Sequence, residues 1–313
     1  MPDARWDVPR TEEGLQLLLS RIAEARQSGD EAGVGLGHLA LAHQVKWVRS
    51  DNDEPPFLRA HTLTEEALSI FRRLDDERGL LAALRATSMF LSPDEIASRQ
   101  AEAMALAESL GDEREIANTL ASKARSLALR NKVDAAQLTR QALEIFRRLD
   151  DKHSAAQCLF SLAIYEEETA ASYEAALESA QLYRETGDFK QAAHAAIVAI
   201  MYGEELHPWP ELEPIVRTGL NDAQAAGSRS DEGLFYGHLA KIAAAKGDAE
   251  EAKNYLRWQR ELDESDGLTP KERHKQNIEM TKQLIEMSKL SGNAETVAMF
   301  EEELKRLKKL RVC

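Results

Sequence analysis

The chain has 313 residues, a formal net charge of −14 and a hydrophobic content of 43%. This acidity argues against general binding to nucleic acid or to an anionic membrane, and because no window holds eighteen uncharged apolar residues we expect no transmembrane span. The two cysteines cannot form a disulfide framework, which favours a reducing cytoplasm as the location.

The N-terminal segment 1–10, MPDARWDVPR, reads as a polar arm without the apolar stretch of a secretory signal. Beyond it, Gly, Pro and β-branched residues are few beside Ala, Leu, Glu and Arg, which favours helix nearly everywhere. The length exceeds that of a typical compact domain, so two globular domains or one extended repeat array are the natural options.

Short polar turns divide the rest of the chain at two alternating sets of positions. The first set lies at residues 30, 76, 112, 151, 188 and about 228, with spacings of 46, 36, 39, 37 and about 40 residues. The second set falls between these turns, at 50–56, 92–94, 130–134, 168–172, 205–214 and 246–248. Two alternating turns with a period near 38 residues predict a helix hairpin that is repeated about seven times.

One predicted helix occurs twice with nearly the same sequence. Residues 63–76, LTEEALSIFRRLDD, return as residues 138–151, LTRQALEIFRRLDD, with eleven of fourteen positions unchanged. The apolar positions have the spacing of a helix with one buried face. A single hairpin has too little surface to bury such a face, so we expect the copies to stack on each other. The Asp pair ends the helix and caps the next one.

The best-patterned hairpin is YGHLAKIAAAKGDAEEAKNYL, residues 236–256. Large, small and turn residues recur there at fixed intervals, namely Tyr236, Leu239, Ala240, Gly247, Ala252 and Leu256. Two further hairpins match in part, one through Leu120, Ala124, Ala136 and Leu143, the other through Leu159, Leu162, Ala163, Ala175 and Leu182. This spacing resembles the tetratricopeptide repeat (TPR), and the long second helices that end in IFRRLDD are similar to the repeats of bacterial signal-transducing ATPase regulators of the MalT type.

The resemblance covers most of residues 12–310 and implies an all-α, right-handed superhelical solenoid of about seven TPR-like hairpins. Residues 1–313 would form a single domain, with 269–313 as a C-terminal capping hairpin. Because the sequence carries neither a P-loop nor a DNA-binding segment, the role of the MalT-type regulators does not carry over.

Motifs for chemistry are missing from the sequence. It has no dinucleotide-binding glycine pattern, no H-E-x-x-H and no C-x-x-C, and its eight histidines are scattered singly without metal-site spacing. We therefore expect a protein that is not an enzyme and that uses no cofactor and no metal.

The resemblance implies a concave face that is lined by the first helix of each hairpin and suits an extended peptide or a helix. The repeat register places eight candidate residues in this groove: His38, Asn118, Ser122, Arg125, Gln157, Phe160, His238 and Lys241. Two of them belong to the tetrapeptide GHLA, which occurs at 37–40 and at 237–240. The alternative is that this recurrence is coincidence together with helix packing at the two glycines.

Two further segments are candidates for a second contact site. In HPWPELEP, residues 207–214, prolines hold Trp209 in an irregular connection, where it either folds back onto the nearest hairpin or stays exposed as an anchor for a partner. From residue 269 onward, ten basic residues face seven acidic ones, which suits a solvated terminal helix. The expected function is a scaffold that binds a protein or peptide partner. The alternatives are a homo-oligomeric assembly protein and a regulatory subunit of an enzyme.

Overall fold

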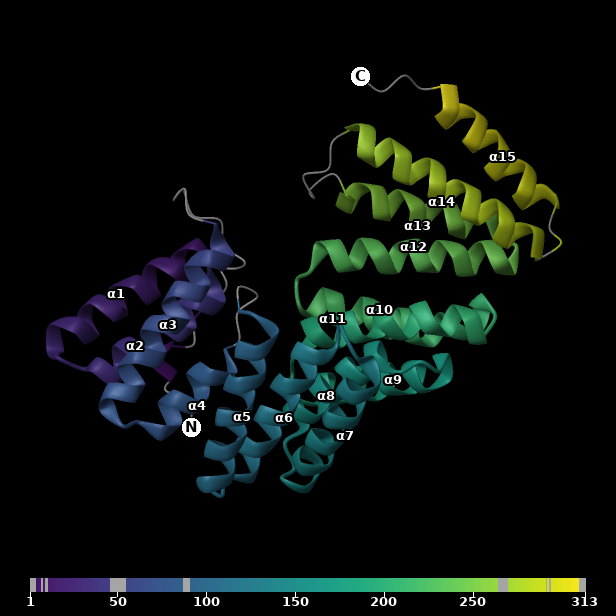
Figure 1. Ribbon diagram of the computed structural model, residues 1–313. Coiled ribbons are helices and arrows are strands. Elements are labelled where there is room, and N and C mark those ends of the chain that lie inside the picture. Colours follow the sequence, from purple (N-terminus) through teal and green to yellow (C-terminus); the bar gives the residue numbers. More distant parts are fainter. Residues whose placement is uncertain are drawn as a thin grey trace. The chain divides into compact units, whose positions relative to one another are not determined.

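The computed structural model describes residues 4–6, 8, 11–45, 55–86, 91–263, 270–290, 292 and 294–309. Within these residues it contains fifteen α-helices, two short 3-10 helices and no strand, so the prediction of an all-α chain is confirmed (Figure 1). None of the described helices is long and apolar enough to cross a membrane. The predicted turn at 50–56, the arm 1–10 and the hairpin 269–313 each lie partly outside the described residues.

The helices belong to two compact units, Met1–Ile145 and Phe146–Cys313. The first unit contains η1 (Ala4–Trp6), α1 (Glu12–Ser28), α2 (Glu31–Gln44), α3 (Pro56–Leu74), α4 (Glu77–Arg85), α5 (Pro93–Ser109) and α6 (Glu113–Leu127). The boundary falls within α7 (Lys132–Arg148). The second unit contains α8 (Lys152–Tyr165), α9 (Thr169–Glu185), α10 (Phe189–Leu206), η2 (Trp209–Leu212), α11 (Glu213–Ala225), α12 (Arg229–Lys246), α13 (Ala249–Asp263), α14 (Pro270–Leu290) and α15 (Ala294–Lys309).

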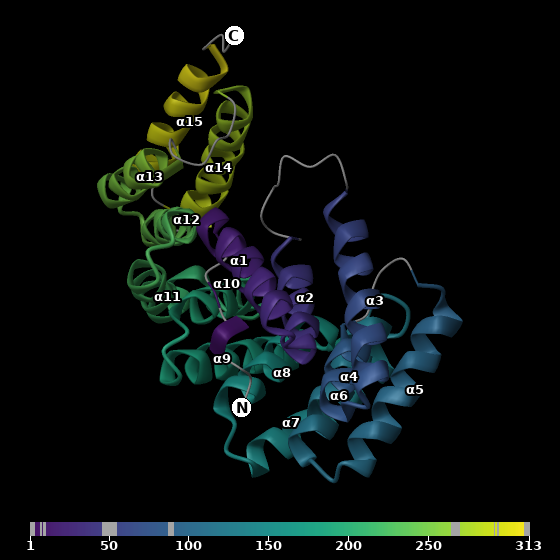
Figure 2. The ribbon, with the colours of Figure 1, turned by 90° about the vertical axis from the view of Figure 1, so that its left-hand side faces the viewer.

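Within each unit a helix packs on the next helix and, in several hairpins, on the next but one. In the first unit α2 packs on α3 and α4, and α4 packs on α5 and α6. In the second unit α10 packs on α11 and α12, and α12 packs on α13 and α14, while α14 and α15 lie side by side in both views (Figures 1 and 2). This pattern makes each unit helical and repeat-like, because every hairpin buries its apolar face against its neighbours.

The first predicted series of turns begins a helix at every position. An aspartate precedes each of five helices, and its side chain accepts a hydrogen bond from a backbone N–H in the first turn, at 2.8–3.3 Å. These aspartates are Asp30, Asp76, Asp112, Asp151 and Asp188, before α2, α4, α6, α8 and α10. The sixth turn, at Ser228, precedes α12. We call the helices that follow these six turns the first helices, and the helix after each of them a second helix.

The duplicated segment forms the same structure twice, as the end of α3 and the end of α7. Asp75 and Asp150 are the only non-glycine residues with positive φ in the described chain, at 51° and 52°. Gly29, Gly111 and Gly187 take this left-handed conformation in the equivalent turns, where a missing side chain removes the steric penalty. The two aspartates of each pair therefore have different roles. The first ends one helix in the left-handed conformation, and the second caps the next helix.

The duplicated helix also makes the same contact with the second helix that follows it. Arg72 of α3 donates to both carboxylate oxygens of Glu102 in α5, at 3.0 and 3.1 Å. Arg147, at the equivalent place in α7, pairs with Glu178 in α9. The repetition in sequence is thus a repetition of how neighbouring hairpins join.

Small residues allow the helices of the second unit to pack closely. A methyl group on Gly219 of α11 would lie 2.3 Å from the ring of Phe235 in α12, so only glycine leaves room for that buried ring. Ala196 in α10 borders the same place. The core thereby seats α12 between α10, α11 and α14, which positions the surface described next.

Candidate functional site

Four of the first helices expose side chains at two equivalent positions that lie on one face of each helix. The thirteenth residue of α6, α8, α10 and α12 is Arg125, Ile164, Met201 and Lys241, respectively. The sixth residue of the same four helices is Asn118, Gln157, His194 and Leu234. All eight side chains are at least partly exposed. Residues seven apart lie on one side of an α-helix, so in each of these helices the two positions, with the ninth and tenth residues between them, lie on one side, which we call the first-helix face.

In the second unit this face carries exposed apolar side chains. Ile164 is 41% exposed, Met201 50% and Leu234 48%, one on each of α8, α10 and α12. The predicted candidates Gln157 and Phe160 lie on the same face of α8, Gln157 exposed and Phe160 half-buried. The three apolar residues were missed from sequence, although Ile164 and Met201, each thirteen residues after a capping aspartate, could have been identified by that shared distance.

A polar contact joins α10 and α12 at the edge of the face. His194 Nε2 lies 3.3 Å from Oδ2 of Asp231, which is buried and also accepts a hydrogen bond of 2.6 Å from the hydroxyl of Ser228. This contact fixes the start of α12 beside α10. The sixth residues of the two helices, His194 and Leu234, are therefore held near each other.

Trp209 reaches the first-helix face from the connection between α10 and α11. It lies in η2, is only 8% exposed and stacks on His238, with ring centroids 5.7 Å apart and an interplanar angle of 21°. The ammonium of Lys241 lies 4.7 Å from the centre of the indole ring, a cation–π contact. Of the two alternatives for this tryptophan, the structure takes the one in which it folds back. Two predicted groove residues, His238 and Lys241, are thereby partly covered by the chain's own connection.

The electrostatics of this cluster are dominated by burial. Burial lowers the pKa of His238 to about 3, and the nearby charge of Lys241 adds to the effect, so the imidazole is neutral at pH 7. Its Nδ1 is buried with no hydrogen-bond partner among the described residues. Burial also lowers the pKa of Lys241, while Glu204 opposes that shift. A neutral ring and a desolvated ammonium thus lie side by side beneath one indole.

In the first unit the predicted candidates differ in how accessible they are. Arg125 is exposed and Asn118 half-buried, both on the first-helix face of α6. Ser122 is buried, and its hydroxyl donates to the backbone carbonyl of Arg85 at 3.1 Å. Its side chain is therefore engaged inside the unit, and only Asn118 and Arg125 remain available to a ligand.

The two copies of GHLA do not occupy equivalent places. His38 is the eighth residue of α2, whereas His238 is the tenth residue of α12. Two residues turn a helix by about 200°, so the two imidazoles lie on opposite faces of their helices. His38 is 4% exposed and takes the packing position that Leu159 takes in α8. The sequence register placed His38 in the groove, and the structure corrects this to the interior.

His38 is held between two charged side chains. Its Nε2 lies 3.0 Å from a guanidinium nitrogen of Arg26, and its Nδ1 lies 3.1 Å from a carboxylate oxygen of Glu66. Burial lowers its pKa, Glu66 opposes that shift and Arg26 adds to it. The glycine before it has a packing role, because a methyl group on Gly37 would lie 2.6 Å from Ile22.

In the described part of the chain, no group of three or more His, Cys, Asp or Glu side chains is placed to hold a metal ion. The first-helix face of the second unit presents apolar side chains next to amide, imidazole and ammonium groups.

No family model matches the chain, so a match to a tetratricopeptide family is not found, and no curated protein sequence matches it. Among solved structures, the chain is similar to BtubC (BKLC) from P. vanneervenii, with 19% sequence identity over 84% of this chain and 95% of that chain, at a TM-score of 0.39. This similarity is too low for any role of that protein to be transferred.

Proposed function

We propose that this protein is a non-catalytic scaffold that binds a peptide or protein segment along the first-helix face of its second unit. In this proposal the hairpins are TPR-like and stack into a right-handed superhelix with the first helices on the concave side. The observation that carries the proposal is the exposure of Ile164 and Met201 at the thirteenth position, and of Leu234 at the sixth position, on the same face of three first helices. Apolar side chains that recur on one exposed face are typical of an interaction surface.

The area of the exposed apolar side chains limits how tightly a partner can bind through apolar contacts alone. Each of the three side chains has roughly half of its surface still exposed, so covering each one contributes about 1 kcal/mol. The sum of ~3 kcal/mol is far below the ~8 kcal/mol of a micromolar complex. A partner must therefore add polar contacts, and an extended segment that crosses α8, α10 and α12 does so by offering its backbone to Gln157, His194 and Lys241.

Selection from a phage-displayed library of random peptides, followed by fluorescence anisotropy of the enriched peptides, tests this proposal. Met201→Glu and Leu234→Glu should each weaken binding roughly tenfold or more, because they place a charge on the apolar part of the face. Leu206→Glu is the matched control, since Leu206 lies in α10, is 41% exposed and points away from the face by its position in the helix. Circular dichroism confirms that each variant is folded.

Two results would overturn the proposal. One is the absence of any enriched peptide, and the other is an enriched peptide that binds the Met201→Glu and Leu234→Glu variants as tightly as the wild type. Light scattering at two protein concentrations separates the homo-oligomeric alternative: self-association that Met201→Glu abolishes would assign the face to a second copy of the chain.

A further inference from the structure

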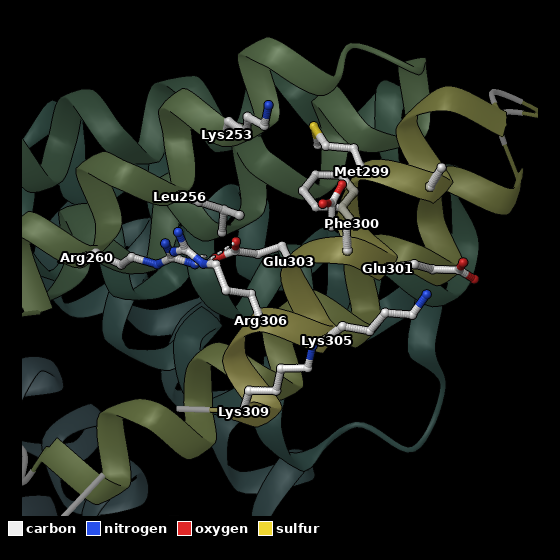
Figure 3. Close-up of a pocket in the computed structure, with 12 residues that line it drawn as sticks. Lys253, Leu256, Arg260, Met299, Phe300, Glu301, Glu303, Lys305, Arg306 and Lys309 are labelled. Carbon is white, nitrogen blue, oxygen red and sulfur yellow. Dashed lines mark hydrogen bonds and ion pairs between the residues drawn. The ribbon is translucent and has the colours of Figure 1, made fainter. Parts of the chain in front are cut away.

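A groove with a volume of about 910 Å³ lies between α13 and α15 (Figure 3). Its floor contains Leu256 and Phe300, which are 6% and 1% exposed, and Met299 lies half-buried beside them. No described residue of a first helix lines this groove, so it is a different surface from the first-helix face.

Two guanidinium groups share one carboxylate in the groove. Figure 3 shows the side chains of Arg260 of α13 and Arg306 of α15 meeting at the carboxylate of Glu303. Arg260 Nη2 lies 3.6 Å from one oxygen of Glu303, and Arg306 Nε lies 3.0 Å from the other. Nε of Arg260 is buried and has no hydrogen-bond partner among the described residues. Because each guanidinium carries five N–H donors, one carboxylate leaves most of them without an acceptor.

The lining of the groove also carries a surplus of positive charge. It contains five Lys or Arg side chains and three Glu side chains, in a chain whose net charge is −14. Lys305 and Lys309 make no ion pair within the described residues. The groove is thus locally opposite in sign to the molecule as a whole, and a partner that fits it must supply carboxylates.

We propose that the α13–α15 groove is a docking site for an acidic segment of a partner protein, with a carboxylate bound by Arg260 and Arg306 and apolar side chains packed on Met299 and Leu256. Guanidinium groups favour carboxylates because two parallel N–H groups match the two oxygens. A peptide fits better than a nucleic acid, because the three glutamates and the overall negative charge repel a continuous chain of phosphates.

The test uses a short fluorescein-labelled peptide in which Glu and Leu alternate, measured by fluorescence anisotropy against the full-length protein. We expect saturable binding that is roughly tenfold or more weaker in the Arg260→Glu/Arg306→Glu double variant. Arg306→Ala, at a side chain that is 67% exposed, should also weaken binding, and it avoids introducing a charge next to Glu303. The matched control is Arg257→Glu, because Arg257 lies on α13 with 63% exposure and does not line the groove.

Two comparison probes test whether the groove prefers carboxylates over ammonium groups and over phosphates. They are a peptide in which Lys and Leu alternate, and an oligodeoxythymidine of similar length. Both should bind roughly tenfold or more weakly than the Glu/Leu peptide. The proposal is overturned if the Glu/Leu peptide does not bind, if it binds the double variant as tightly as the wild type, or if the oligonucleotide binds better. A Glu/Leu peptide that loses affinity equally in Arg257→Glu would also overturn it, since the charge effect would then be general.

Discussion

Replacing His238 by Gln should make the second unit less sensitive to acid. In the folded chain burial under Trp209 lowers the pKa of His238 to about 3, compared with an ordinary value of 6.5. The unfolded chain therefore binds a proton below pH 6.5 that the folded chain does not bind until about pH 3. Where the unfolded state binds more protons than the folded state, lowering the pH reduces the free energy of unfolding. The contribution of His238 to this free energy is therefore complete above pH 6.5 and decreases as the pH falls toward 3.

The two pKa values set the magnitude of this loss. Each unit between them is worth about 1.4 kcal/mol, so from pH 7 to pH 5 the wild type should lose ~2 kcal/mol through His238 alone. Gln keeps a polar side chain of similar size but does not titrate. Its variant should therefore lose about 2 kcal/mol less over the same pH range. The buried His38 is present in both proteins, so its titration cancels in the comparison.

Hydrogen exchange of the α12 amides, corrected for the intrinsic pH dependence of exchange, measures the opening free energy of this segment. The opening free energies of wild type and His238→Gln should differ increasingly as the pH is lowered from 7 to 5. Parallel pH dependence in the two proteins would refute the reasoning, because it would mean that folded His238 binds a proton as easily as the unfolded chain does. Trp209→Ala provides an independent check, since exposing the imidazole should raise its pKa toward 6.5 in an NMR titration.

Two predictions concern stability and are checked by thermal or urea unfolding. Asp75→Gly should stabilise the first unit by about 0.5–1 kcal/mol, because glycine takes the left-handed conformation without the steric strain of a side chain. Asp76→Ala should destabilise the unit by about 1 kcal/mol, because it removes a helix cap. An unchanged or lower stability of Asp75→Gly would contradict the assignment of strain to Asp75. Arg184→Ala should destabilise the second unit by about 3–5 kcal/mol, because it leaves the buried carboxylate of Asp222 without its two-point partner at 2.7 and 2.9 Å. Arg147→Ala, which removes an exposed ion pair, should change stability by less than about 1 kcal/mol, and equal effects of the two arginine changes would contradict the burial argument.

The amino-acid sequence by itself determined the helices and the turns between them. Asp76 and Asp151 act within one turn of their own backbone, and the apolar spacing of residues 63–76 reports a buried face whatever the partner is. Signals of this kind are local, so the turn positions and the repeated hairpin could be predicted without any long-range contact. The duplicated segment even predicted an equivalent structure, which Asp75 and Asp150 confirm with nearly equal φ angles.

The tertiary structure alone decided which side chains are available for binding. His38 and His238 have the same neighbours in sequence, yet α12 begins two residues earlier relative to its copy of GHLA, and this turns the two imidazoles to opposite faces. Trp209 comes from a connection that the repeat pattern does not describe, and its burial on His238 and Lys241 depends on how η2 packs against α12. The α13–α15 groove likewise arises from residues more than 35 positions apart in sequence, Arg260 and Glu303 among them. The exposure and the pKa of a side chain depend on such distant neighbours, which helical periodicity in the sequence does not reveal.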